Sequence, residues 1–153
     1  MHALRRLAHA SSMCRRPCVM APVCKMPFSI SAVRLAPDYL QQCDDALESI
    51  HNVVDELSDG KLSDHVDDII YDSGVLSIQL KNVGTYVLNR QAPNKQIWLS
   101  SPVSGPYHYD MVCSSTGAVR WLDTKDQHNL GDKLRKEFKD LYGDDVEFFV
   151  GES

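Results

Sequence analysis

The sequence has 153 residues, of which 43% are hydrophobic and 24% are charged, and its formal net charge is −5. This length suits one domain with one sizeable core, and the composition is that of an ordinary globular protein. No apolar run approaches the roughly 18 to 20 residues that cross a bilayer, so we expect no membrane-spanning segment and no membrane partner.

Acidic and basic residues are distributed unevenly along the chain. All 21 acidic residues lie at Asp38 or beyond, and six of the 16 basic residues precede it, so residues 38–153 carry a formal charge of −11. An acid-free segment with arginine, serine and alanine is typical of an organellar transit peptide. We interpret residues 1–37 as a mitochondrial leader, cleaved between about Cys24 and Pro37, with a disordered basic tail as the alternative. The mitochondrial matrix is the expected location, and so acidic a body predicts no nucleic-acid partner.

The spacing of apolar residues predicts two helices. Over residues 38–57 apolar side chains recur at intervals of three and four, and Gly60 supplies a stop. The same period returns over residues 130–141, where Asn129 is a plausible N-cap and Gly143 a C-terminal stop. Each predicted helix therefore has an apolar stripe that must be buried on another layer.

Between these helices the pattern changes to short β-like runs separated by turn residues. The runs are VDDIIY, VLSIQL, TYVLNR, KQIWLS, YHYDMVC and AVRWLD. Such spacing predicts a meander of antiparallel strands. Two amphipathic helices can bury their stripes only on a shared sheet, so we expect an α+β two-layer sandwich with both helices on one face. The last residues, DDVEFFV, could fold back against the core.

The run KQIWLS raises a question about Trp98. Alternation directs Ile97 and Leu99 to the core and leaves Gln96, Trp98 and Ser100 on the open face of the sheet. An aromatic residue on a polar, rigid surface is the usual anchor of a protein interface. The alternative is that a neighbouring strand or the C-terminal segment partly covers Trp98. The spacing leaves both interpretations open.

Three stretches together resemble the frataxin family: DSGVLSIQL, GTYVLNRQAPNKQIWLSSPVSGPYHYD and the later Trp121. The resemblance covers nearly all of residues 38–142. It implies an antiparallel sheet of five to six strands with two helices on one face, within a frataxin-like domain at 38–153. It also implies a mitochondrial protein that binds iron and assists iron-sulfur cluster assembly on a complex of cysteine desulfurase and scaffold protein.

The resemblance also assigns a metal-binding surface, which we call the acidic ridge. Its members are Asp44, Asp45, Glu48, Asp55 and Glu56 on the first helix and Asp68 at the edge strand, to which the local sequence adds Asp64 and Asp67. Like charges four residues apart destabilise a helix, and a cation relieves that repulsion. Between residues 38 and 60 no lysine or arginine balances these charges. Carboxylates bind calcium, magnesium, manganese or iron, so the residues alone do not select the metal. The resemblance implies that the metal is iron, and we expect it to be weakly bound.

Two histidines lie near these carboxylates. Glu48 and His51 form a Glu-x-x-His pair, as in di-iron helix bundles, but those proteins need a second copy and two further glutamates. We therefore expect His51, and likewise His65, to be an occasional ligand. His128 is interpreted as a residue at the entry to the second helix.

The resemblance assigns a second surface to the open face of the sheet. Its partner-contact residues are Asn89, Gln91, Lys95, Gln96 and Trp98, and Trp121 matches a second family tryptophan. His108 stands where some members have arginine, which offers five donors and a permanent charge that histidine lacks. Asn52 stands where an acid is common.

These features lead to one functional expectation and two alternatives. We expect an iron-binding protein that binds and stimulates the cysteine desulfurase and scaffold complex, with delivery of ferrous iron as a further role. A ferroxidase that stores oxidised iron in oligomers is one alternative, and an acidic interaction module that needs no metal is the other. A monomer is expected, with iron-dependent oligomers as an alternative. The sequence contains no recognisable nucleophile with its base, P-loop or dinucleotide fingerprint.

Overall fold

The computed structural model describes residues 38–151, so the predicted leader lies outside the described residues. Six strands form one antiparallel sheet in the order β1-β2-β3-β4-β5-β6, in which every strand pairs with its neighbour in sequence. The elements are α1 (Tyr39–Asp59), β1 (Val66–Asp72), β2 (Val75–Leu80), β3 (Gly84–Gln91), the short 3₁₀ helix η1 (Ala92–Asn94), β4 (Gln96–Ser101), β5 (Gly105–Cys113), β6 (Val119–Asp123) and α2 (Leu130–Tyr142).

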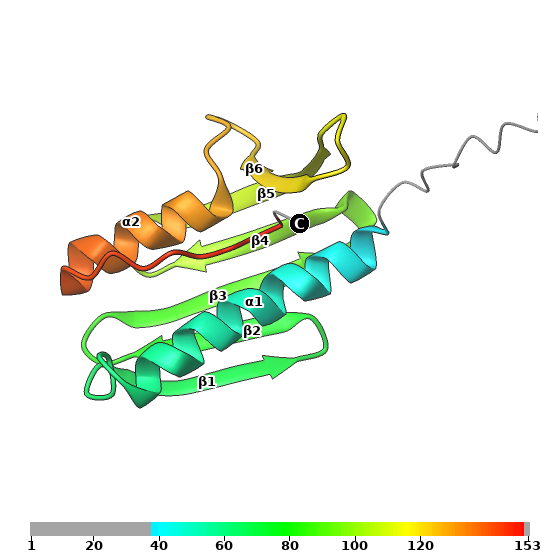
Figure 1. The fold of residues 1–153 in the computed structure, drawn as a ribbon. Coiled ribbons are helices and arrows are strands. Elements are labelled where there is room, and N and C mark those ends of the chain that lie inside the picture. The colour runs from blue at the N-terminus through cyan, green and yellow to red at the C-terminus, as the bar shows by residue number, and fades with distance from the viewer. Residues whose placement is uncertain (1–37, 152–153) are drawn as a thin grey trace, which may run out of the picture. The chain divides into compact units, whose positions relative to one another are not determined.

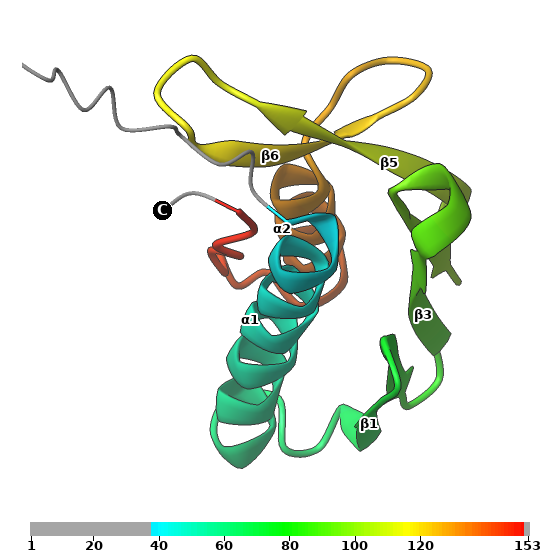
Figure 2. The ribbon, with the colours of Figure 1, turned by 90° about the vertical axis from the view of Figure 1, so that its right-hand side faces the viewer.

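Both helices lie on the same face of the sheet (Figures 1 and 2). The edge-on view in Figure 2 shows α1 and α2 next to each other, with the twisted sheet curving around them. The predicted α+β two-layer sandwich is therefore confirmed. Neither helix within residues 38–151 is long and apolar enough to cross a membrane.

The helix α1 begins where the sequence supplies a cap. The Asp38 side chain accepts a hydrogen bond from the Leu40 backbone N–H at 3.3 Å, and the helix ends before Gly60. Its buried residues are Tyr39, Cys43, Ala46, Leu47, Ile50 and Val54. Because these positions recur every three or four residues, one stripe of α1 packs on the sheet and the opposite stripe is left for charged residues.

Alternation along the strands separates the core face from the open face. In β4, Ile97 and Leu99 are buried while Gln96 and Trp98 are half-buried on the other side, as predicted. The edge strand β1 departs from strict alternation, because its register with β2 shifts between Val66 and Asp68. Such a bulge adds one residue to one strand and turns the following side chains to the opposite face.

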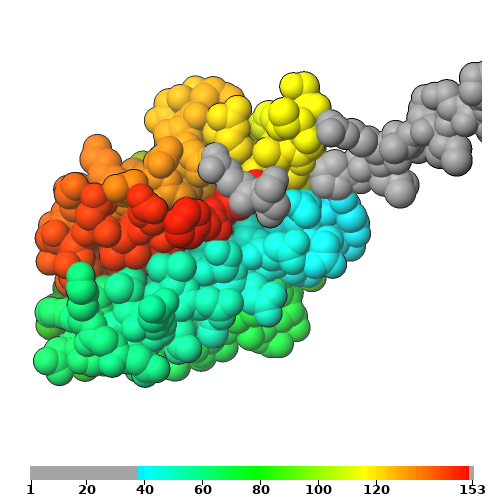
Figure 3. All heavy atoms as spheres, viewed as in Figure 1, coloured from blue at the N-terminus to red at the C-terminus, as the bar shows by residue number. Residues whose placement is uncertain are grey.

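The segment after α2 folds back over the helix layer, as the sequence suggested. Phe148 and Val150 are buried, and Ser49 Oγ donates a hydrogen bond to the Phe149 carbonyl oxygen at 2.7 Å. The space-filling view in Figure 3 shows this segment (red) lying between α1 (cyan) and α2 (orange). Arg135 of α2 donates two hydrogen bonds to Asp145, at 2.6 and 2.8 Å, and so holds the start of the segment. The segment closes the gap between the two helices.

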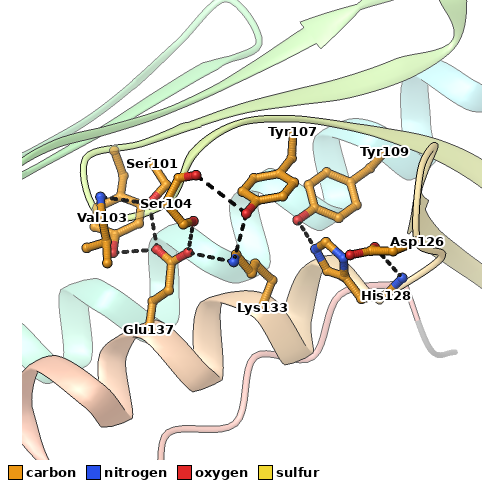
Figure 4. A network of polar contacts seen from close by, with 10 residues as sticks. Ser101, Val103, Ser104, Tyr107, Tyr109, Asp126, His128, Lys133 and Glu137 are labelled. Carbon is orange, nitrogen blue, oxygen red and sulfur yellow. Dashed lines mark hydrogen bonds and ion pairs between the residues drawn. The ribbon is translucent and has the colours of Figure 1, made fainter.

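A buried carboxylate connects α2 to the sheet. Glu137 is 4% exposed and accepts hydrogen bonds from Tyr86 and Ser101, at 2.8 and 2.6 Å, and from Ser104, with Lys133 Nζ 3.2 Å away (Figure 4). Burial alone would raise the pKa of Glu137, but these hydrogen bonds outweigh burial and hold it below its ordinary value. Glu137 is thus ionised and fully partnered, which fixes α2 against the β4–β5 connection.

Candidate functional site

Most carboxylates of the acidic ridge project from α1 into solvent. Glu48 and Asp55 lie opposite the buried stripe, and Asp45 and Glu56 lie further round the helix; all four are exposed. Among the ion pairs of residues 38–151, none involves these four side chains. A shallow, open groove runs along this side of α1. Its lining residues are Asp45, Glu48, Ser49, Asn52, Val53 and Glu56.

Asp44 differs from the other ridge residues because it already has a cationic partner. Arg90 of β3 places Nη1 2.5 and 2.6 Å from its two carboxylate oxygens, and the Tyr71 hydroxyl donates to Oδ1 at 3.2 Å. Burial and the Asp44 carboxylate together raise the pKa of Tyr71 to about 12, so this hydroxyl remains protonated. Arg90 of the sheet therefore neutralises part of the negative charge of the acidic ridge. The lack of basic residues within the helix did not predict this pairing.

The carboxylates near the edge strand lie in the turn before β1 and among its first residues. Asp64, Asp67 and Asp68 are all exposed, and the register shift of β1 allows the adjacent Asp67 and Asp68 to face solvent together. Lys81 Nζ lies 3.8 Å from Asp67 Oδ1, an exposed pair of little energetic weight. These side chains remain available to a cation.

The two histidines proposed as occasional ligands contact aromatic rings. His51 is half-buried, with its ring centroid 6.4 Å from that of Tyr71 and Nδ1 3.4 Å from Asn52 Oδ1. His65 is exposed, with its ring centroid 4.9 Å from that of Tyr142. Their role as ligands stays a prediction.

The ridge does not form a compact ligand cluster. Within residues 38–151, one group brings three potential ligand atoms within 4.8 Å of one another, and that group lies beyond β6, away from α1 and β1. Separate carboxylates on a helix and a strand favour weak, exchangeable cation binding over a centre of fixed geometry.

On the open face, Trp98 lies at the centre of a row that crosses three strands. It pairs with Asn89 of β3 on one side and with His108 of β5 on the other. The Trp98 and His108 rings stack, with centroids 4.4 Å apart and planes at 29°. Trp98 is half-buried, so a neighbouring strand covers it in part, as the alternative interpretation required. The row Asn89–Trp98–His108 nevertheless lies at the surface, because Asn89 and Trp98 are half-buried and His108 is exposed.

The Gln96 side chain links Trp98 to Asp110 of β5 by two hydrogen bonds. Its Oε1 accepts a hydrogen bond from Trp98 Nε1 at 2.9 Å, and its Nε2 donates to Asp110 Oδ1 at 2.8 Å. Gln91 pairs with Gln96 across the strands, and Lys95, in the turn before β4, is exposed. The sequence analysis did not single out Asp110, although its position two residues after His108 placed it on the same face.

Trp121 requires a correction. The sequence analysis grouped it with the partner-contact residues, but it is 0% exposed and packs edge to face against Tyr39, with ring centroids 6.0 Å apart. Its neighbours in alternation, Val119 and Asp123, are also buried, and Arg120 between them is exposed. Trp121 therefore belongs to the core under α1 and contributes no surface to a partner.

Comparison with known proteins decides the family. A family model described as a frataxin-like domain matches residues 35–144. The chain belongs to the frataxin family. Frataxin of *Caenorhabditis elegans* is 38% identical over 109 residues, covering 71% of this chain and 77% of the relative. The frataxin-like protein of *Leishmania donovani* is 42% identical over 103 residues, covering 65% of this chain and 52% of the relative. Both relatives are named mitochondrial, and the predicted mitochondrial localisation is confirmed.

Solved frataxin structures share the fold. Trimeric yeast frataxin complexed with ferrous iron has a TM-score of 0.59 and 31% identity, covering 78% of this chain and 100% of that chain. A bacterial relative from *Pseudomonas fluorescens*, 34% identical and covering 64% of this chain and 90% of the relative, is named the iron-sulfur cluster assembly protein CyaY. The family thus includes a protein of iron-sulfur cluster assembly. Several mitochondrial relatives are longer, and the match spans about half of their length.

Proposed function

We propose that this frataxin binds ferrous iron on the acidic ridge and assists iron-sulfur cluster assembly by binding a cysteine desulfurase and scaffold complex through the row Asn89–Trp98–His108. The observation that carries the proposal is the separation of two surfaces. Exposed carboxylates lie on α1 and at the start of β1, and an aromatic row lies on the sheet face away from the helices.

The donor set of the ridge suits ferrous iron as cargo. Glu48, Asp55 and Glu56 offer hard oxygen ligands without a competing ion pair among the described residues. Because these ligands are exposed and separate, they bind iron weakly and release it readily. A ferroxidase needs defined geometry around its iron, and the spread of these carboxylates does not favour that alternative.

The aromatic row suits a protein partner. A central tryptophan surrounded by amide side chains such as Asn89 and Gln96 is typical of the residues that contribute most to an interface. The neighbouring His108 and Asp110 add polar contacts at its rim. The name of the relative from Pseudomonas fluorescens supports iron-sulfur cluster assembly as the process this surface serves.

A titration with ferrous iron, followed by amide NMR signals, tests the first half of the proposal. Shifts are expected along residues 44–56 and 64–68, with the signals around Trp98 unchanged. The double variant Glu48→Lys with Asp55→Lys should lose most of these shifts. The control is Asp140→Lys, which reverses an exposed charge on α2. Tight binding on the open face would contradict the assignment.

Desulfurase turnover tests the second half. We expect the chain to stimulate the cysteine desulfurase and scaffold complex, and a Trp98→Ala variant to lose that stimulation. A parallel assay in chelator distinguishes the roles of the two surfaces. Unchanged binding and stimulation without metal would favour the metal-independent interaction module, whereas iron oxidation by the isolated chain would favour the ferroxidase.

A further inference from the structure

A second group of potential metal ligands lies at the junction of β6 and α2. Asp123 ends β6, Asp126 lies in the following turn, and His128 precedes Asn129, the N-cap of α2. Asp123, Asp126 and His128 each offer one potential ligand atom, and these three atoms lie within 4.8 Å of one another. Their spacing, Asp-x-x-Asp-x-His, brings two carboxylates and an imidazole together within six residues. None of the three belongs to the acidic ridge.

One carboxylate oxygen of Asp123 is buried without a hydrogen-bond partner among the described residues. The residue is 1% exposed, and its Oδ2 accepts hydrogen bonds from the backbone N–H groups of Lys125 and Asp126, at 2.8 and 3.2 Å. Its Oδ1 is buried and has no hydrogen-bond partner among the described atoms. A buried, unsatisfied carboxylate oxygen costs free energy unless it is paired or coordinates a cation. Oδ1 is therefore a carboxylate oxygen already removed from water, and the hydrogen bonds to Oδ2 hold the carboxylate in place.

His128 is oriented in the same way. Its Nε2 lies 2.8 Å from the hydroxyl oxygen of the buried Tyr109, and its Nδ1 contacts the Asp126 carboxylate (Figure 4). Histidines that bind metals through one ring nitrogen almost always donate the other N–H to an oxygen acceptor. A proton on Nδ1 joins it to the Asp126 carboxylate; a bound cation would replace that proton, and the Nδ1 lone pair would then coordinate the cation while Nε2–H donates to Tyr109. Asp126 is exposed, so the group is open to solvent on that side.

We propose that Asp123, Asp126 and His128 form a binding site for a divalent transition-metal ion, with Asp123 Oδ1, an Asp126 carboxylate oxygen and His128 Nδ1 as ligands. An imidazole with two carboxylates suits Mn²⁺, Fe²⁺, Co²⁺ or Zn²⁺, whereas Mg²⁺ and Ca²⁺ prefer oxygen ligands alone. Water fills the remaining positions on the exposed side. The ion links the end of β6 to the start of α2 and so stabilises the turn between them.

Paramagnetic Mn²⁺ tests this site in the full-length chain. Substoichiometric Mn²⁺ is added to the ¹⁵N-labelled protein in excess Mg²⁺, which occupies oxygen-only sites on the ridge. We expect amide signals of residues 123–129 to broaden first. Asp126→Asn and His128→Gln should weaken this broadening by about tenfold or more, the scale on which metal sites respond to altered ligands and their supporting contacts. The control Asp140→Asn, which removes an exposed carboxylate from α2, should behave as wild type.

The variants separate loss of a ligand from loss of the fold. Asp126 is exposed, so its asparagine variant should keep the native amide spectrum, and Asp123→Asn retains an acceptor for the two backbone N–H groups. The proposal is overturned if broadening in excess Mg²⁺ is confined to α1 and β1, or if folded Asp126→Asn and His128→Gln broaden as wild type does. The ridge variant Glu48→Lys with Asp55→Lys should leave the signals of residues 123–129 unaffected, so this site and the proposed iron surface fail independently.

Discussion

The Arg90 guanidinium reaches from β3 to α1 and binds Asp44, with Nη1 2.5 and 2.6 Å from the two carboxylate oxygens. The same side chain covers Gly74, where an added Cβ would lie 2.8 Å from Arg90 Nε. The pair therefore joins three elements of the fold. It also occupies a carboxylate that would otherwise be free to bind a cation.

Removing this positive charge should strengthen cation binding on α1. In Arg90→Gln the Asp44 carboxylate becomes available, and a nearby charge that repels the cation is lost. A unit charge at about 4 Å changes the free energy by about 1 kcal/mol even in bulk water, so ferrous or manganous affinity should rise by about threefold to tenfold. Calorimetric titration measures it. Arg120→Gln, which removes an exposed arginine from the other face, should leave the affinity unchanged; a weaker affinity in Arg90→Gln would show that the pair holds the ridge in its binding geometry.

Replacing the buried carboxylate of Glu137 should destabilise the fold in a pH-dependent way. The glutamine variant leaves three hydroxyl donors and the Lys133 ammonium without their anion, at a cost of about 3 kcal/mol at pH 7. Because the folded pKa of Glu137 lies below its ordinary value of 4.5, the stability it contributes is fully present above about pH 5. That stability is lost as the pH falls through the folded pKa.

Chemical denaturation at pH 7 and at pH 3.5 measures the Glu137 effect. The difference between wild type and Glu137→Gln should shrink at the lower pH, because glutamate is then protonated in the unfolded chain and increasingly so in the folded one. Glu56→Gln, an exposed carboxylate on α1, should match wild type at both values. A difference independent of pH would mean that packing, not charge, determines the role of Glu137.

Trp98→Ala should preserve the fold and remove most of the partner affinity. The substitution loses the stack on His108 and part of a half-buried ring, so a stability loss of about 1 to 2 kcal/mol is expected. At an interface a central tryptophan commonly contributes 2 kcal/mol or more, roughly a thirtyfold loss of affinity for the desulfurase complex. Binding and thermal unfolding are measured together. Ile70→Ala, an exposed apolar residue at the edge strand, is the control; equal effects of both variants would deny Trp98 a special role.

Trp121→Ala should show the opposite pattern. Its ring is fully buried beneath the start of α1, so truncation leaves a cavity and costs about 3 to 5 kcal/mol. Thermal unfolding should therefore shift far more than in Trp98→Ala. Any molecules that remain folded should bind the partner with normal affinity. A mild effect on stability with a large effect on binding would return Trp121 to the partner surface.

The sequence predicted the architecture because its apolar periods are strong. Intervals of three and four define α1 and α2, and alternation in β4 separates Ile97 from Trp98. The same alternation in β6 puts Trp121 on one face with the apolar Val119, which favours a place in the core. The family resemblance instead grouped Trp121 with the partner contacts. Local patterning thus succeeds where one face is clearly apolar.

Contacts between distant elements lay beyond the sequence. The pairing of Asp44 with Arg90 depends on how α1 crosses β3, 46 residues later. The Asp123–Asp126–His128 group was not predicted, because the buried state of Asp123 Oδ1 depends on the packing of β6 and the following turn. Burial and cross-element charge pairs are properties of the assembled layers, so residue patterns alone do not specify them.

The strand order has a consequence for how the chain folds. Since every strand pairs with its neighbour in sequence, the sheet grows hairpin by hairpin and each step closes only a short loop. The C-terminal segment is the exception, because Ser49 and Phe149, which it brings together, are 100 residues apart. Its docking must wait until both helices are in place. During synthesis on the ribosome, the apolar surface that Phe148 and Val150 cover therefore stays exposed until those two residues have emerged.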